Sequence, residues 1–330
     1  MEMLTIGGLR RKFIRLNGDF RRHYFADVPV DLDAIGEFRN DAFPASGPTC
    51  WLDRPDALLA VERRLAEEAI SADDAEICRK WIVDGYYIAP GLIEHDLLDR
   101  TWEAYERAAR DGRIVLQPES AGEADHHPGR QLDPHLQVPE VAALQRHPGI
   151  LRIVDLLFGR PTVPFQTIMG HKGSQQAPHS DAIHMTTYPL GFLVANWIAF
   201  EDIHPDSGPL EYYPKSHRLL PYLLSREVGI APWEFKEKGY GVYNERYEPA
   251  IRRHLDVHGL QPQFFCARKG DVLFWHSNLV HGGSARRDLK HSRRALVCHY
   301  FAKGAVTYHD LSGNPSRLHR DGLYAEARPD

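Results

Sequence analysis

The chain has 330 residues, which is enough for one large domain or two small ones. Hydrophobic residues make up 43% and charged residues 26% of it, and this balance excludes a disordered or fibrous protein. Lys and Arg number 40 against 45 Asp and Glu, so the net charge is −5 and a nucleic acid is not expected as a partner. The 19 histidines are numerous for this length and direct attention to metal ligands.

The cysteines and the N-terminal sequence favour a location in a reducing compartment. None of the four cysteines forms a CxxC pair, which argues against a zinc ribbon or a disulfide framework and favours a reducing compartment. Basic residues at positions 10–12 interrupt the N-terminus before an apolar stretch of signal-peptide length, and no run of about 18 apolar residues occurs. We therefore expect a soluble, cytoplasmic protein with no membrane partner.

The first half of the chain is predicted to be mainly helical. Apolar residues recur at helical period over 56–70. A second helix is expected to begin after Ser71, whose hydroxyl can cap it, and to end at Gly85. The sequence YYIAP then indicates a short strand. Further helices are predicted over residues 97–109, 139–146 and 150–158, whereas residues 1–53 give no clear pattern.

After Pro161 the pattern changes to short strands. Aromatic and β-branched residues are concentrated in the runs VPFQTIM, GFLVANWIAF, PLEYY, DVLFW and RALVCHYF, which Gly, Pro, Asp and Ser separate. Such a series, with no helix between most of the runs, favours an antiparallel barrel or sandwich. Helix-like sequence such as EPAIRRHL interrupts it and is expected to form an insertion over residues 219–262.

Three residues form a candidate metal-binding set. His179 and Asp181 are two positions apart in PHSDAIH, so their side chains would share one face if the segment is extended. An imidazole and a carboxylate supply two ligands of the 2-His-1-carboxylate triad that binds Fe(II) with open positions. The candidate third ligand is His281, expected in the loop after the strand DVLFW.

A candidate co-substrate arginine follows on the next predicted strand. Arg294 begins the run RALVCHYF and Arg293 directly precedes it, and a guanidinium there can form a bidentate pair with a carboxylate. An open iron site beside such an arginine suits 2-oxoglutarate, whose keto acid chelates the metal while the arginine binds the far carboxylate.

Five segments, in order, resemble the phytanoyl-CoA dioxygenase family. They are HSD, WIAFEDI, SGPLEYYPKSHR, KGDVLFWHSNLVHGG and SRRALVCHY. The similarity covers roughly residues 70 to 303 and includes WIVDGYYIAPGLI near its start. The family consists of Fe(II)- and 2-oxoglutarate-dependent oxygenases with a double-stranded β-helix (jelly-roll) fold. The resemblance implies a mainly β, cupin-like core with flanking helices, and Fe(II), 2-oxoglutarate and O2 as cofactor and co-substrates.

Carried over by position, the resemblance implies roles for individual residues. The iron ligands would be His179, Asp181 and His281. The 2-oxoglutarate arginine would be Arg293, seven residues before an aromatic residue, whereas Arg294 would project from the opposite face of the strand. Further residues implied near the co-substrate are Trp197, Gln166 and, with a weaker claim, Lys172. Gly283 stands where the family often has Ser or Thr, and Ser284 follows it.

The domain organisation is predicted as a single oxygenase domain over residues 70–330. It would comprise a helical flank at 70–160 and a jelly-roll core at 161–303 that contains the insertion. Residues 1–69 form an N-terminal extension that could cover the active site, mediate dimerisation or extend the fold. The sequence gives no indication of the oligomeric state.

The predicted function is hydroxylation of a C–H bond in a small-molecule substrate, with release of succinate and CO2. The presence of Asp181, where related halogenases have Gly or Ala, favours hydroxylation over halogenation. Desaturation, epoxidation or cyclisation at the same iron site remain alternatives, as does a cupin-like protein that binds a metal or small molecule without turnover. A zinc hydrolase is disfavoured because no glutamate is placed as a general base.

The sequence also gives expected positions for several residues around the candidate site and its entrance. His184 either faces the substrate or forms a hydrogen-bonded wall, Trp275 is expected in the core, and His299 is expected to pack within a strand. Segments 113–137 and 219–262 are expected to line the entrance with Arg113, Arg130, His135, Trp233, Tyr240, Tyr243 and Arg246. This mixture suggests a polar small molecule with some apolar body.

Overall fold

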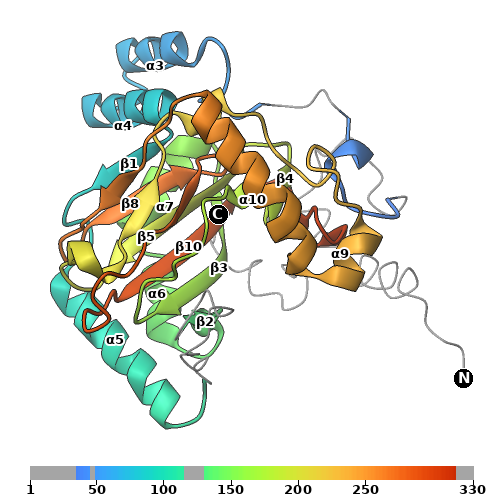
Figure 1. The fold of residues 1–330 in the computed structure, drawn as a ribbon. Helices are drawn as coiled ribbons and strands as arrows, with labels where there is room; N and C mark the ends of the chain where they lie inside the picture. Colours follow the sequence, from blue (N-terminus) through green and yellow to red (C-terminus); the bar gives the residue numbers. More distant parts are fainter. Residues whose placement is uncertain (1–34, 45–48, 115–129, 317–330) are drawn as a thin grey trace, which may run out of the picture.

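The computed structural model describes residues 35–44, 49–114 and 130–316, and Figure 1 shows the arrangement of their elements. The largest sheet has six antiparallel strands in the order β1-β8-β5-β10-β3-β2. Their bounds are β1 Tyr86–Ala89, β2 Arg130–Leu132, β3 Thr162–Gly170, β5 Leu193–Ala199, β8 Val272–His276 and β10 Ala295–Ala302.

Two smaller antiparallel sheets complete the β-structure. One has the order β12-β11-β4 and the other β7-β6-β9. Their bounds are β4 Thr186–Tyr188, β6 Leu210–Tyr212, β7 Gln263–Phe265, β9 His281–Gly283, β11 Val306–His309 and β12 Asn314–Pro315. In the large sheet, four of the five neighbouring pairs join strands that are not consecutive in the chain, which is typical of a jelly roll, and the predicted double-stranded β-helix is confirmed.

The helices expected in the first half are present and share one hydrophobic cluster with the large sheet. They are α3 Ala57–Ala66, α4 Ala72–Asp84, α5 His95–Arg110, α6 Pro139–Gln145 and α7 Pro148–Phe158. Helix α4 contacts β1, and α7 contacts β3 and β10. Ser71 caps α4 in a capping box with Asp74, and Gly85 ends it in the left-handed conformation, as the sequence predicts.

The central strand β5 has one row of side chains in each of two hydrophobic clusters. Val194 and Ile198 belong to the cluster formed with the helices. Ala195 and Trp197, which alternate with them, belong to the cluster on the inner side of the barrel. Because all seven residues of β5 are buried, the strand is hydrophobic on both faces, and its sequence shows no simple alternation.

The predicted insertion is helical and lies on the opposite side of the large sheet from α7 (Figure 1). It contains α9 Pro232–Lys238 and α10 Tyr240–Val257, and α10 includes the sequence EPAIRRHL. Tyr247 and Ile251 of α10 pack against Ile183 and Val280, which lie next to the candidate metal ligands. Helix α10 therefore forms one wall beside the predicted site.

Part of the N-terminal segment packs into the core of the sheet. Phe38, Phe43, Trp51 and Val61 are buried in the same hydrophobic cluster as the helices and the large sheet. The residues before position 35 lie outside the described part of the chain, so the division at residue 69 stays a prediction. Within the described ranges, no helix is both long and apolar enough to cross a bilayer.

Candidate metal centre and its cavity

His179, Asp181 and His281 come together although 100 positions separate the last two. Each offers one ligand atom, and these atoms lie within 4.8 Å of one another. Asp181 Oδ1 is 3.9 Å from His179 Nε2 and 3.6 Å from His281 Nε2. All three residues are buried. Among the described residues, this is the only group of histidines, cysteines and carboxylates close enough to hold a metal ion.

Backbone pairing holds the two histidines side by side. The backbone N–H of each donates to the backbone oxygen of the other at 2.9 Å, which forms an isolated antiparallel bridge. Two local expectations were wrong in detail. His281 begins strand β9 instead of lying in a loop, and Asp181 begins a short 3-10 helix, with only Ser180 between the ligands extended. The two histidines are therefore positioned by this backbone bridge, and not by a continuous strand over residues 179–181.

Hydrogen bonds on the far side of each ring orient both imidazoles. Nδ1 of His179 lies 2.9 Å from the carbonyl of Ala177, and Nδ1 of His281 lies 3.0 Å from the carbonyl of Leu279. A carbonyl only accepts, so both Nδ1 atoms donate, and in the neutral ring of this tautomer the lone pair is on Nε2, toward Asp181. Two imidazole nitrogens and one carboxylate oxygen fit the donor set of a mononuclear Fe(II) site.

Asp181 is held by residues that the sequence analysis had assigned to packing. Trp275 Nε1 donates to Asp181 Oδ2 at 2.8 Å, and His299 Nε2 lies 3.6 Å from the same oxygen. Burial alone raises the pKa of the Asp181 carboxyl, but His281, His299 and His179 lower it below its usual value. Burial lowers the pKa of His179 to about 3, so its ring is neutral and able to bind a metal.

Gln176 is a further residue of the site that sequence reasoning missed. Its side-chain nitrogen lies 3.2 Å from His179 Nε2, on the side where a metal would bind. No motif marks it, because it belongs to an irregular segment before the first ligand. The glutamine amide can donate a hydrogen bond to His179 Nε2. It would have to move when a metal binds to that nitrogen.

Arg293 is buried in the same cavity as the three candidate ligands, with 7% of its surface exposed. Its Nη1 donates to the carbonyl of Gly208 at 3.0 Å, while its Nε has no hydrogen-bond partner. The guanidinium carbon lies 5.7 Å from the ring centre of Trp197. Burial, together with the nearby Arg130, lowers the pKa of Arg293 to about 10. This is a desolvated cation with spare donors, as a carboxylate clamp requires.

Arg294 points away from the cavity, as the strand alternation predicts. Its guanidinium carbon lies 5.0 Å from the ring of Trp102, and its Nε lies 3.7 Å from Glu201 Oε2. By contrast, Arg293 shares its face with every second residue that follows, and the cavity is lined by Ala295, Val297 and His299.

The cavity has a volume of about 970 Å³. Gln166, Trp197 and Lys172 line it together with the three candidate ligands, and their role beside a co-substrate stays a prediction. Ser284 does not replace the missing hydroxyl at position 283, because its Oγ donates to the carbonyl of Pro209 at 2.8 Å.

The residues expected at the entrance divide into two groups. Arg130, Tyr240 and Tyr243 line the cavity, and so does His184, whose Nε2 lies 3.3 Å from the Tyr243 hydroxyl. The other four are not among its lining residues: Arg113, His135, Trp233 and Arg246. For example, His135 is buried against Thr167, with its Nδ1 2.7 Å from the threonine Oγ1.

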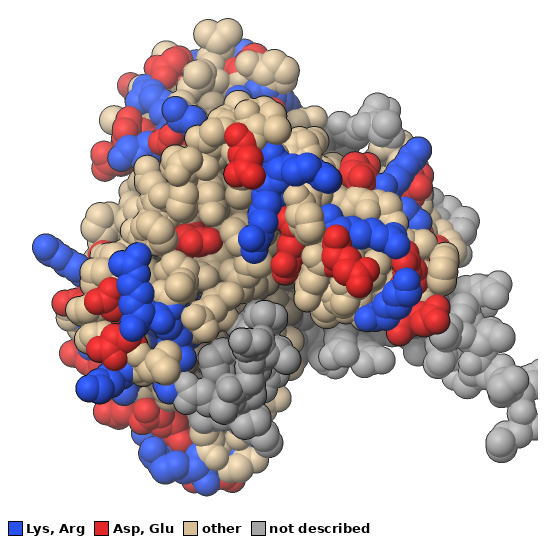
Figure 2. Space-filling model, viewed as in Figure 1, with Lys and Arg blue, Asp and Glu red and all other residues tan. Residues whose placement is uncertain are grey.

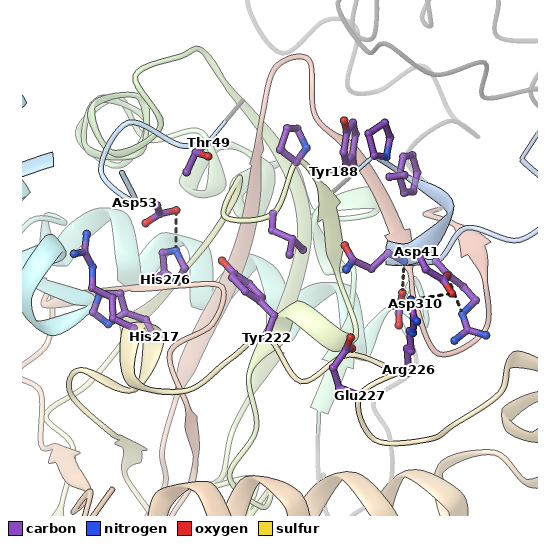
Figure 3. Close-up of a pocket in the computed structure, with 17 residues that line it drawn as sticks. Asp41, Thr49, Asp53, Tyr188, His217, Tyr222, Arg226, Glu227, His276 and Asp310 are labelled. Atoms are coloured by element: carbon purple, nitrogen blue, oxygen red, sulfur yellow. Dashed lines mark hydrogen bonds and ion pairs between the residues drawn. The ribbon is translucent and has the colours of Figure 1, made fainter. Parts of the chain in front are cut away.

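A second cavity of about 610 Å³ lies apart from the candidate ligands, and Figure 3 shows its lining. His276 Nε2 and Asp53 Oδ2 are 3.3 Å apart at one end of it. At the other end Asp41 lies 3.6 Å from Arg39 and 3.9 Å from Arg226. Asp41 and the two arginines thus pair within the protein, in contrast to Arg293 in the larger cavity.

A family model described as phytanoyl-CoA dioxygenase (PhyH) matches residues 81–295, which is more than half of the chain. The chain belongs to the phytanoyl-CoA dioxygenase family. It is 24% identical over 249 residues to the human protein "Phytanoyl-CoA dioxygenase, peroxisomal", which covers 70% of this chain and 68% of that protein. It is 29% identical over 267 residues to mouse "Phytanoyl-CoA dioxygenase domain-containing protein 1", with coverage of 76% and 84%.

Solved structures of low sequence identity share the fold. A non-heme alpha-ketoglutarate-dependent carbocyclase from nogalamycin biosynthesis, SnoK, superposes with a TM-score of 0.56 at 19% identity, covering 86% of this chain and 95% of that one. EctD from S. alaskensis gives 0.52 at 20% identity, with coverage of 71% and 77%. Family membership and the His-Asp-His group together confirm iron- and 2-oxoglutarate-dependent oxygenase chemistry, with Fe(II), 2-oxoglutarate and O2 as its cofactor and co-substrates.

Proposed function

We propose that this protein is a dioxygenase that hydroxylates a C–H bond of a small organic substrate, with release of succinate and CO2. His179 Nε2, Asp181 Oδ1 and His281 Nε2 would hold the iron, and Arg293 would hold the far carboxylate of 2-oxoglutarate. One observation carries this proposal: the three ligand atoms and the desolvated guanidinium line a single cavity of about 970 Å³. A binding protein without turnover would not need both features.

The iron centre supplies, with 2-oxoglutarate and O2, the oxidant that removes hydrogen from the substrate. The contribution of the chain is to fix geometry. The carbonyls that accept from Nδ1 hold both imidazoles in the metal-binding tautomer, and Trp275 keeps Asp181 Oδ2 occupied so that Oδ1 faces the histidines. Trp197 and Gln166 would line the co-substrate from the large sheet. Helix α10, through Tyr243, covers the cavity on the side expected for the substrate.

Location and partners are proposed from coarser observations. We propose a cytoplasmic protein, which is supported by the four cysteines, since all of them are free. We propose a small molecule as the only substrate class. On the face shown in Figure 2, acidic and basic side chains are interspersed, in keeping with a protein that does not bind nucleic acid.

The decisive experiment is an anaerobic titration of metal-free protein with Fe(II) and then 2-oxoglutarate, followed by visible absorption. We expect the weak charge-transfer band of a chelated keto acid. His179→Ala should abolish the band, because one ligand is lost. Arg293→Ala should retain it only at much higher 2-oxoglutarate concentration, because the far carboxylate loses its partner. Bound iron without any band would contradict the proposal and leave a metal-binding protein with the jelly-roll fold.

A further inference from the structure

Arg130 is a half-buried cation at the candidate active site, and none of the described residues forms a hydrogen bond or an ion pair with its guanidinium. The residue begins β2, at the edge of the large sheet. An arginine that loses water without gaining a partner is costly, because burial of an unpaired charge is unfavourable. Burial does lower the pKa of Arg130 from its usual value.

Strand pairing places the Arg130 side chain on the cavity face. In the β2–β3 register, Arg130 lies opposite Gly170 and Leu132 opposite Ile168, and all four residues line the cavity. Gln131, between them, does not line it. Residues directly opposite in an antiparallel pair share one face, so this alternation is consistent. Gly170 contributes no side chain to this face, so the Arg130 side chain meets none from its cross-strand neighbour.

Among the described residues of the site, no acidic side chain forms an ion pair with Arg130. This step rests on the function proposed above. The carboxylates of Asp181 and 2-oxoglutarate would balance the divalent iron and Arg293. The remaining charged residues of the lining are two glutamates, Glu211 on β6 and Glu248 on α10, and two cations, Lys172 and Arg252. Neither glutamate forms an ion pair with Arg130. A negative group on the substrate would supply the missing charge.

Aromatic rings form the wall next to this position. The ring of His184 lies 5.9 Å from that of Tyr240 and 5.0 Å from that of Tyr243, and 5.9 Å from the ring of the candidate ligand His179. Such rings contact an apolar or planar body without requiring a particular hydrogen bond. This wall and the guanidinium therefore suit different parts of one molecule beside the metal ligands.

We propose that Arg130 binds an anionic group of the substrate, a carboxylate or a phosphate ester, and so positions the body of the substrate between the metal site and the wall formed by His184, Tyr240 and Tyr243. Arginine suits either anion because its planar donors can form two parallel hydrogen bonds to it. The proposal assigns Arg130 to substrate selection, whereas Arg293 is assigned to the co-substrate.

The test uses the full chain with Fe(II) and saturating 2-oxoglutarate under anaerobic conditions, and measures binding by calorimetry. The probes are matched pairs that differ in charge: hexanoate with hexanamide, and 3-phenylpropanoate with 3-phenylpropanamide. Hexyl phosphate distinguishes a phosphate preference from a carboxylate preference. The variants are Arg130→Met and Arg130→Lys, and Arg253→Met on the exposed surface of α10 is the matched control.

We expect the wild type to bind the anions at least tenfold more tightly than the amides. Arg130→Met should remove this preference, Arg130→Lys should retain part of it, and Arg253→Met should leave it unchanged. Wild-type protein that shows no preference for the anions would overturn the proposal. So would a parallel loss of 2-oxoglutarate affinity in Arg130→Met, which would assign Arg130 to the co-substrate.

The 2-oxoglutarate band recorded before each titration separates the two proposals. If the wild-type protein binds iron but shows no 2-oxoglutarate band, the proposed function is wrong. If it appears and only the charge preference is absent, the proposal for Arg130 alone is wrong. Arg130→Lys keeps the test valid if the methionine variant does not fold, since the shorter cation should still weaken anion binding relative to arginine.

Discussion

Trp275 Nε1 and Asp181 Oδ2 are joined by a buried 2.8 Å hydrogen bond between residues 94 positions apart. The bond occupies one carboxylate oxygen and turns the other, Oδ1, toward His179 and His281. A residue that fills the core on one strand therefore also orients a candidate metal ligand on a different segment. Partners of this kind tune metal affinity almost as strongly as the ligands do.

Replacement of the indole donor should weaken iron binding. Trp275→Phe keeps a large aromatic ring but removes the hydrogen bond, so Asp181 is free to rotate. We expect a loss of about 10- to 100-fold in Fe(II) affinity, measured by anaerobic titration of the metal-free protein. Trp233→Phe, at a residue with 66% of its surface exposed, is the matched control. Unchanged affinity in Trp275→Phe would show that the bond does not orient the carboxylate.

The arginine assigned to 2-oxoglutarate should not be replaceable by lysine. Arg293→Lys keeps the positive charge but loses the planar pair of donors. We expect 2-oxoglutarate affinity to fall by about 10- to 150-fold, the equivalent of one charged hydrogen bond of about 1.5–3 kcal/mol. Arg294→Met is the control, because that side chain points away from the cavity. Similar losses in both variants would contradict the assignment of Arg293.

Gly283 should tolerate no side chain. A Cβ there would overlap Ser174 Oγ and come within 2.7 Å of the Gln175 backbone nitrogen. We expect Gly283→Ala to lower the free energy of unfolding by about 1–3 kcal/mol, measured by denaturant titration, and also to weaken Fe(II) binding, since β9 carries His281. In contrast, Gly241→Ala in α10 meets no atom within 4 Å and should stabilise the protein by about 0.5–1 kcal/mol. Equal effects would refute the packing argument.

The buried His135 should make stability depend on pH. Burial lowers its pKa from 6.5 to about 4. The unfolded chain binds a proton below pH 6.5 that the folded protein does not bind, so stability is complete above pH 6.5 and is lost as the pH falls toward 4.

The corresponding variant is His135→Gln. Between pH 6.5 and 5 it should lose about 1.5 kcal/mol less stability than the wild type does. The measurement is denaturant unfolding at several pH values, and His258→Gln on the exposed end of α10 is the control. The same pH dependence in His135→Gln and the wild type would show that this residue does not contribute.

Local signals in the sequence predict the helices and most of the strands. The Ser71 capping box and the left-handed Gly85 act within one turn of the helix they bound, so the sequence alone specifies both ends of α4. The alternation of side chains in the extended segment that leads into β10 similarly separates Arg293 from Arg294, because the side-chain period of an extended chain depends only on the backbone. The order of the motif segments identified the family, and with it the triad.

The tertiary structure decided how distant segments meet. Trp275 lies on a strand buried on both faces, where alternation gives no signal, so only the fold shows that its indole contacts Asp181. The bridge between His179 and His281 replaced the expected extended segment and loop, because each backbone found its hydrogen-bond partner across 102 positions of sequence. Likewise, the sequence placed Arg130 near the entrance, but that no described residue forms an ion pair with it depends on every element around the cavity. Such contacts follow from strand order and register, which no local pattern encodes.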